Sequence, residues 1–462
     1  MLVYRLRRIV KAPRPIACPL RTVVVGAARC AMVVMAGAAP VAGAQTSPTV
    51  TNVFPVTFSG EVRARSEWER PGGALQADAF TYLRSRFGVK VDATPNAHIF
   101  LQVQDSRVLG GEGNPLTTAS TLFDLHQAYL ELSAPWHTAT FAARVGRQEI
   151  PLSNERLVGV SNWTNTGRSF DGLRLLLSPA NAKSGAELWT ATAFAATVEE
   201  HGRHFGSAVN ETGVLKEADH SLAGLFLSRR VTTPGTGVLN VEATALYDAG
   251  SAFRSYHNAN RSTLDGRLRT ANLYGFRAEV EGALQFGRQR YAPDTLHNSY
   301  QDVGAWLFAF RVGNADKTDA RTSVAIGLDL LSGDDTPADG KYSAFSTLFA
   351  SNHAFYGLQD IIGDPAASTK ERGLIDALAT ASEKLSSVVS LKAELHHFTL
   401  ASGSNTALGW EADITVPVRI GSAAGLDFGY SLFRPQAGAA AVGLGTAGQT
   451  RHWAYLQLRA GF

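Results

Sequence analysis

The chain has 462 residues, with 43 Lys and Arg against 40 Asp and Glu, a net charge of +3 and a pI near 8.8. Seven of the basic residues and none of the acidic ones lie in residues 1–44, so the remainder carries 36 basic and 40 acidic residues, a net charge of −4. This balance gives no support for a nucleic-acid partner. Both cysteines, Cys18 and Cys30, also lie in that segment, which excludes a disulfide or thiol site from the rest.

Residues 1–44 are predicted to be a secretory signal peptide. A long basic stretch is followed by an apolar run at residues 30–40 and then by Ala42-Gly43-Ala44, which matches an A-x-A cleavage site. We therefore expect cleavage after Ala44 and an exported protein.

Residues 45–462 contain short segments in which apolar and polar side chains alternate. Within residues 57–68, Phe58 and Val62 share one face, whereas Arg63 and Arg65 share the other. A charged face cannot contact lipid, so it must line a lumen. No apolar run approaches the 18 residues that a spanning helix requires. The pattern predicts an all-β domain, a transmembrane antiparallel β-barrel of the bacterial outer membrane.

The predicted strands are placed by alternation and then tested by the lengths of their connections. They are residues 57–68, 80–91, 98–104, 124–132, 140–148, 170–177, 186–195, 222–228, 238–248, 263–269, 273–286, 303–312, 322–331, 373–380, 387–398, 408–418, 424–433 and 453–462. Segments 263–269 and 373–380 are included because short periplasmic turns and long external loops must alternate. The result is 18 strands, with long external loops near residues 105–123, 147–169, 196–221 and 332–372.

The C-terminal segment indicates the class of barrel. In residues 452–462, alternate positions are apolar and the chain ends in Phe462. This resembles the assembly signal of outer-membrane barrels. An apolar edge strand of this kind would be an aggregation liability in a soluble sandwich. We therefore expect outer-membrane lipid and the outer-membrane assembly machinery as partners.

Charged side chains recur at the positions that face the predicted lumen. They are Arg63, Arg65, Arg84, Arg86, Arg144, Arg174, Lys392 and Glu394. An arginine can bind a carboxylate through two parallel hydrogen bonds. A row of such weak sites would let a polyanion move from one site to the next. The alternative is that Arg and Glu on neighbouring strands only pair across the wall. The sequence leaves both interpretations open.

Two of the predicted external loops have distinctive compositions. The loop at residues 147–169 is rich in Arg and carboxylates, which suggests a lined passage more than a packed core. The loop at residues 334–360 contains several Asp residues without the order of an EF-hand, so a solvated loop is favoured over a calcium site. Its aromatic residues, Phe345, Phe349, Phe355 and Tyr356, predict that it folds back over or into the pore.

Enzyme motifs are absent. The sequence contains no H-E-x-x-H, no G-x-S-x-G and no cysteine nucleophile after residue 44. His396 and His397 would point to opposite faces of a strand. A barrel hydrolase with His126 or His396 beside a serine is left as a distant alternative. We predict no enzyme activity, no metal and no cofactor.

Several blocks in order resemble the alginate export family of outer-membrane porins. They include GEVRARSEWE, DLHQAYLEL, GRQEIPLSNERLVGVSNWTNTGRSFDGLRL, LLSGDD and LFASNHAFYGLQD. The resemblance implies an 18-stranded monomeric barrel that conducts an anionic polysaccharide through an Arg-rich constriction. It assigns that role to Arg144, Arg147, Arg168, Asp171 and Arg174, and to Arg63, Arg65, Arg84 and Arg86. A Lys common in the NHAFYG block is replaced here by Ala354.

These observations lead to two functional hypotheses. The first is passive export of an alginate-like polyuronate, with periplasmic polysaccharide-synthesis proteins as further partners. The second is uptake of small organic anions or sugars by a general porin. Neither the direction of transport nor the state of the loops follows from the sequence.

Overall fold

The computed structural model describes residues 54–73, 76–110, 122–180, 188–199, 220–233, 237–251, 258–290, 300–315, 321–336, 339–404 and 406–462. The predicted signal peptide, with cleavage after Ala44, lies outside the described residues, as do the middle parts of the predicted loops 105–123 and 196–221. Within the described ranges, no helix is both long and apolar enough to cross a membrane.

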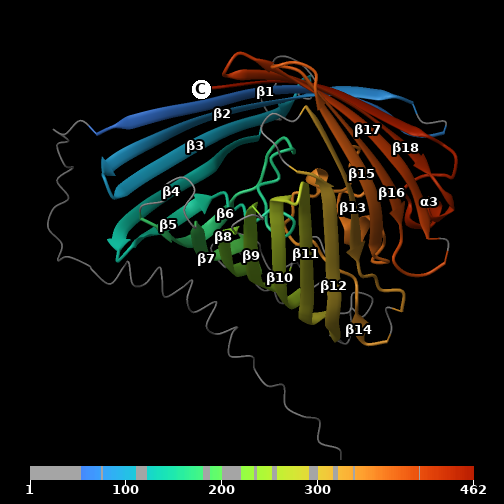
Figure 1. Cartoon of the computed structure of the whole chain (residues 1–462), viewed down its shortest axis with the longest axis horizontal. Coiled ribbons are helices and arrows are strands. Elements are labelled where there is room, and N and C mark those ends of the chain that lie inside the picture. Colours follow the sequence, from blue (N-terminus) through green and yellow to red (C-terminus); the bar gives the residue numbers. More distant parts are fainter. Residues whose placement is uncertain are drawn as a thin grey trace, which may run out of the picture. The chain divides into compact units, whose positions relative to one another are not determined.

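The described residues form a closed wall of eighteen antiparallel strands. These are β1 (Val56–Arg70), β2 (Asp78–Thr94), β3 (Ala97–Val108), β4 (Leu122–Trp136), β5 (Ala139–Gln148), β6 (Phe170–Pro179), β7 (Trp189–Glu199), β8 (His220–Thr233), β9 (Gly237–Ser251), β10 (Asn258–Leu273), β11 (Phe276–Arg290), β12 (Tyr300–Asn314), β13 (Thr322–Leu331), β15 (Leu374–Lys384), β16 (Ser390–Thr399), β17 (Ala407–Ile420), β18 (Ala424–Pro435) and β19 (Arg451–Gly461). Figure 1 shows consecutive strands side by side in chain order, and β1 pairs with β19 to close the wall. The predicted fold class and strand number are confirmed.

Most strands are longer than predicted. For example, β10 covers Asn258–Leu273, whereas alternation predicts only residues 263–269. Above the lipid-facing band the outer positions need not be apolar, so the alternation fades although the hydrogen-bonded ladder continues. The structure also contains β14 (Lys341–Tyr342), a two-residue strand parallel to part of β12 within a long loop, which the sequence does not predict.

The two faces of the wall differ as the alternation predicts. Phe58 and Val62 on β1 are 56% and 53% exposed, whereas Arg63 and Arg65 on the same strand are 4% and 2% exposed. On β2, Arg84 is fully buried. The apolar residues thus face outward and the charged residues face the lumen, where other parts of the chain cover them.

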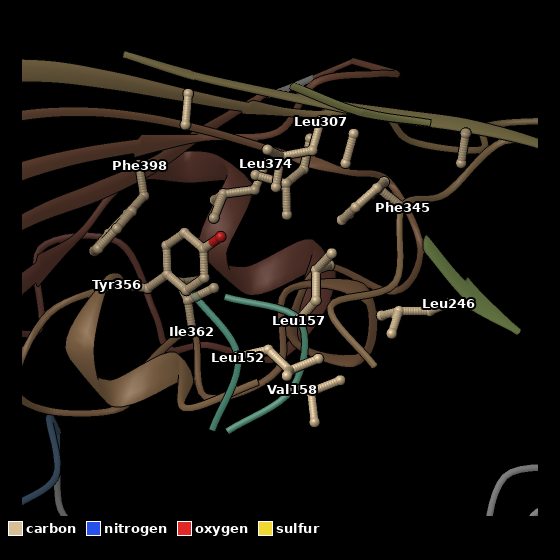
Figure 2. Packing of buried hydrophobic residues seen from close by; sticks show 14 of the residues in the cluster. Leu152, Leu157, Val158, Leu246, Leu307, Phe345, Tyr356, Ile362, Leu374 and Phe398 are labelled. Atoms are coloured by element: carbon tan, nitrogen blue, oxygen red, sulfur yellow. The ribbon is translucent and has the colours of Figure 1, made fainter. Parts of the chain in front are cut away.

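Two external loops turn into the lumen and build a packed core there. We name them the first lumen loop, residues 149–169 between β5 and β6, and the second lumen loop, residues 332–373 between β13 and β15. Figure 2 shows Leu152, Leu157 and Val158 of the first loop in one apolar cluster with residues of the second loop and of the wall. The other labelled residues are Phe345, Tyr356, Ile362, Leu246, Leu307, Leu374 and Phe398. The sequence-based preference for a lined passage over a packed core at the first loop is wrong, because apolar residues at alternate places in this polar segment are buried. The predicted inward folding of the aromatic loop is confirmed.

Three short helices complete the described structure. The 3₁₀ turn η2 (Asn352–Ala354) and the helix α2 (Pro365–Ser368) belong to the second lumen loop, and α3 (Ala437–Val442) lies between β18 and β19. Asp364 caps α2, because its carboxylate accepts hydrogen bonds from the backbone N–H groups of Ala366 and Ala367 at 3.1 and 3.4 Å. This cap stabilises α2 within the second lumen loop.

Candidate channel through the lumen

The two lumen loops are joined by backbone hydrogen bonds. Val158 and Phe349 form a parallel β-bridge. The N–H of Phe349 donates to the carbonyl of Leu157 at 2.9 Å, and the N–H of Gly159 donates to the carbonyl of Phe349 at 2.8 Å. The N–H of Ser351 donates to the carbonyl of Glu155 at 2.9 Å. The loops therefore act as one element inside the wall.

Arg168, predicted to bind substrate, lies at this junction. Its guanidinium donates to the carbonyls of Gly159 and Ala350 at 3.1 and 3.2 Å and also to that of Phe349. Burial lowers its pKa, against the opposing effect of Glu155. Because its donors are used on backbone carbonyls, Arg168 positions the two loops against each other.

The arginines of β1 and β2 hold the first lumen loop from one side. Arg63 Nη1 donates to the carbonyl of Asn162 at 2.6 Å, and Arg65 Nη1 donates to that of Trp163 at 2.6 Å. Arg84 Nη2 bonds Glu61 at 2.5 Å, while its Nη1 reaches the Asn162 carbonyl at 3.2 Å. Arg86 Nη2 donates to the Thr166 carbonyl at 3.2 Å. We name these four residues the clamp arginines. Pairing with glutamates across the wall, seen here for Arg84, is one of the two predicted interpretations. Their contacts with the carbonyls of the first lumen loop are not predicted by the sequence.

Arg156 holds the same loop from distant strands. Its side chain is 2% exposed; its Nε bonds Glu281 on β11 at 3.0 Å, and its Nη1 bonds Asp329 on β13 at 2.8 Å. The guanidinium also lies 4.1 Å from the centre of the Phe355 ring. Burial alone would lower the pKa of Arg156, but Asp329 and Glu281 hold it well above its ordinary value. Sequence reasoning did not select Arg156, because the contacts that distinguish it lie 125 and 173 residues away.

The second lumen loop is held on β17 by two buried carboxylates. The N–H of Gln359 donates to Glu411 Oε1 at 2.9 Å, and the N–H of Leu358 donates to Asp413 Oδ2 at 3.3 Å. The approach requires glycine at position 357, where φ is +85° and a Cβ would lie 2.4 Å from Glu411 Oε1. Both loops are thus fixed to the wall by charged side chains.

A cavity of about 380 Å³, which we name the inner chamber, lies between the loops and strands β10–β16. Six cationic side chains and two carboxylates line it. They are Arg156, Arg267, Arg269, Arg277, Arg311 and Lys392, with Glu279 and Glu394. Arg269 and Lys392 are the most exposed of these cations, at 48% and 50%, and Lys392 Nζ lies 2.6 Å from Glu394. Lys392 and Glu394, which are predicted to face inward, therefore line a cationic chamber.

A second cavity of about 850 Å³, the outer chamber, is lined only by residues of the two lumen loops. Its lining is rich in amides and hydroxyls, and it contains the stacked rings of Trp163 and His353, 4.0 Å apart. Asn154 and Ala354 line both chambers. We name this shared boundary the neck.

The remaining predicted site residues lie on β5 and β6. Arg144 and Arg174 are opposite each other in the register and face inward; Arg144 Nη2 bonds Glu131 at 2.7 Å. Within the described part of the chain, Arg174 Nε has no hydrogen-bond partner. Arg147 and Asp171 pair at 2.9 Å, but their side chains lie on the outer face of the wall, together with Phe141 and Val145. They therefore do not line the lumen.

The distant enzyme alternative is represented by His126. Its Nε2 lies 2.9 Å from Glu149 Oε1, and its Nδ1 lies 3.4 Å from Ser169 Oγ. His126 is 2% exposed and lines neither chamber, so this arrangement gives no reason to infer a reaction. In the predicted loop 334–360, the Asp334 and Asp339 carboxylates accept backbone N–H groups of their own loop. No group of three or more His, Cys, Asp and Glu suited to a metal occurs in the described residues.

Comparison with known proteins agrees with this architecture. Residues 54–405 match the alginate export family, which is most of the chain. The chain belongs to the alginate export family. No curated protein matches the chain. The predicted family is thus confirmed.

Solved structures similar to this family member are outer-membrane porins of Pseudomonas. Pseudomonas aeruginosa OccK8 (OprE) has a TM-score of 0.56 at 10% identity, covering 88% of this chain and 98% of that one. OccK2 (OpdF) of the same organism, solved in complex with glucuronate, gives 0.55 at 11%, covering 88% and 98%. A BenF-like porin from Pseudomonas fluorescens Pf-5 gives 0.55 at 10%, with the same coverage. At these identities the likeness shows the fold alone. Family and fold together identify an outer-membrane channel, and the relatives are channel proteins rather than enzymes.

Proposed function

We propose that this channel conducts anionic saccharides of the uronate type, and that it exports an alginate-like polyuronate. The observation that carries the proposal is the inner chamber, where six cationic side chains and two carboxylates line the path. Cations that remain open to water can bind carboxylates weakly and at several points, as conduction requires. Arg144 and Arg174 add two inward guanidiniums on β5 and β6.

The comparisons support the substrate class. The family takes its name from alginate export, and the OccK2 structure was solved with glucuronate, a sugar acid. A polyuronate repeats one carboxylate per sugar ring, so successive cationic side chains can take over successive carboxylates. The residues that we assign to this role are Arg269, Arg277 and Lys392 in the inner chamber, with Arg144 and Arg174.

Uptake of small organic anions is the second candidate. It is favoured by the packed core in the lumen, because the joined loops leave a path bounded by the neck at Asn154 and Ala354. A small anion requires less space at this boundary than a polymer does. Export through the outer membrane also requires the signal peptide and the assembly machinery proposed from the sequence; synthesis proteins in the periplasm would supply the polymer.

Single-channel recording in planar bilayers tests the proposal. We expect anion selectivity in salt gradients and block by oligouronate. The double variant R144E/R174E and the double variant R269Q/K392Q should lose most of the block. Arg288, which pairs with Asp302 on the outer face, provides the control variant R288Q, which should behave as the parent. An open pore that is indifferent to oligouronate and to all these substitutions would contradict the proposal and favour a general porin.

A further inference from the structure

The two chambers differ in the sign of the charges they expose. In the outer chamber the exposed charged residues are Asp360 and Asp364. The Asp360 side chain is 41% exposed, and its Oδ1 lies 3.0 Å from His353 Nδ1. Its one lining arginine, Arg168, is turned onto three backbone carbonyls. In the inner chamber the most exposed charges are Arg269 and Lys392. The acidic and cationic surfaces therefore belong to two adjacent chambers that share Asn154 and Ala354.

The neck that separates them carries no charge. Its shared lining residues are Asn154 and Ala354. Asn154 is held in place, because its Nδ2 donates to Glu281 at 2.7 Å and its Oδ1 accepts the N–H of Arg156 at 3.1 Å. Each chamber thus keeps its own charge up to a short neutral boundary.

Charges behind these surfaces are mostly compensated. Glu242, Glu281 and Asp329 pair with Arg267, Arg156 and Arg311 behind the inner chamber. The clamp arginines behind the outer chamber have Glu61, Glu67 and Glu149 as partners. Buried pairs act on ions at short range only, so the exposed residues dominate the field that a passing ion meets.

The topology fixes which chamber faces which side of the membrane. Arg269 and Arg277 flank the short turn at Tyr274 and Gly275, and Lys392 follows the short turn between β15 and β16. Short turns of such barrels face the periplasm, whereas long loops face outward. The cationic inner chamber therefore opens to the periplasm, and the acidic outer chamber opens to the exterior.

We propose that these oppositely charged chambers in series make the channel electrically asymmetric, so that it rectifies ionic current and admits polyanions faster from the periplasmic side. Each chamber concentrates the ion of opposite sign. A voltage that drives cations inward and anions outward raises the concentration of both ions in the neck. The reverse voltage lowers that concentration, so the current is smaller. The entry rate of a polyanion is raised at the periplasmic mouth and lowered at the outer mouth, whereas the equilibrium across a passive channel is unchanged. This inference rests on the proposed function only for the identity of the polyanion.

The test is current at opposite voltages in symmetric KCl, with channels of known orientation. The chain has no cysteine after residue 44, so Y274C on a periplasmic turn allows orientation to be read with an impermeant thiol reagent. We expect the two currents to differ by up to about fivefold at ~0.01 M salt, the local concentration effect of a unit charge at contact distance in water. The difference should vanish at ~1 M salt, where the Debye length falls to about 3 Å.

Two matched variants identify the charges responsible. D360N/D364N should reduce rectification while preserving the fold, because Asn retains the hydrogen-bonding shape and caps helices as well as Asp. R269Q/K392Q should also reduce it, whereas R288Q should not. If the parent conducts equal currents at low salt, or if neither double variant changes the ratio, the inference is overturned.

Oligouronate added to one side at a time separates this inference from the proposed function. A higher association rate from the periplasmic side, made more equal by D360N/D364N, supports the inference. Block with equal rates from both sides overturns the asymmetry and leaves the uronate channel intact. Absence of block from either side, with rectification of small ions present, contradicts the proposed substrate and leaves the asymmetry intact.

Discussion

The clamp arginines and the arginines of the inner chamber are alike in sequence and differ in what they contact. The clamp arginines and all the inner-chamber arginines except Arg156 occupy inward positions on strands. Arg63 and Arg84 are buried because the carbonyls of the first lumen loop reach them, whereas Arg269 keeps about half of its side chain open. A guanidinium that is saturated by carbonyls fixes the shape of a pore, and one that faces water can bind what passes. The difference is made by the path of a loop, not by the strand.

The largest effect is expected from removing the anchor at Arg156. In R156A, Glu281 loses its buried arginine partner, whereas Asp329 keeps Arg311. Removing one partner of a buried ion pair costs about 3–5 kcal/mol. We expect a lower unfolding midpoint together with larger, noisier conductance as the first loop detaches. Chemical denaturation and single-channel recording measure both. R288A, which breaks an exposed pair, should leave both unchanged; equal effects of the two variants would contradict the anchoring role.

The next effect sharpens the contrast between the two arginine groups. R63A and R84A each remove charged hydrogen bonds to the loop, worth about 1.5–3 kcal/mol apiece. We expect lower stability and higher conductance with anion selectivity largely retained. R269Q/K392Q should show the reverse pattern, with normal stability and lowered selectivity. Identical behaviour of the two sets of variants would contradict a difference in role between the clamp arginines and the exposed cations of the inner chamber.

A smaller effect is expected at the neck. A354K places a cation at the boundary of the two chambers, on an exposed position that accommodates a longer side chain. Conductance should fall and oligouronate should remain bound longer, because a charged site then adjoins the inner chamber directly. Residence times of the blocker in single-channel records measure this. A354Q adds a longer side chain without a charge. It should not prolong the block, because the positive charge is what holds the oligouronate.

The smallest predicted effect concerns pH and the second lumen loop. Burial, together with Asp334, raises the pKa of Glu371, whose Oε1 accepts a hydrogen bond from the Tyr342 hydroxyl at 3.2 Å. A carboxyl with a raised folded-state pKa contributes stability below its unfolded pKa, and this contribution is lost as the pH rises through the folded value. E371Q should therefore flatten a small decline in thermal stability above pH ~4, the ordinary range of Glu. A parent and variant with parallel pH profiles would show that Glu371 does not contribute.

Alternation of side chains, together with the lengths of the connections, predicted the wall because each strand separates lipid from water. The same parity also places Arg147 on the face of Phe141 and Val145, so the sequence contained the signal that this residue leaves the lumen. The resemblance to a family assigned it to the pore without regard to parity. The packed core, the clamp and the Arg156 anchor could not be predicted, since they depend on where two loops meet, and no local pattern encodes that meeting.

The bridge between Val158 and Phe349 has a consequence for how such pores diverge. Because backbone hydrogen bonds join residues 155–159 of the first lumen loop to residues 349–351 of the second, both loops together determine the size of the opening. A deletion or insertion in one loop displaces the other, although eight wall strands, β6 to β13, separate them in the sequence. Changes of substrate size in this family should therefore arise through paired changes in the two loops. To transfer the selectivity of one relative to another, both loops must be exchanged together.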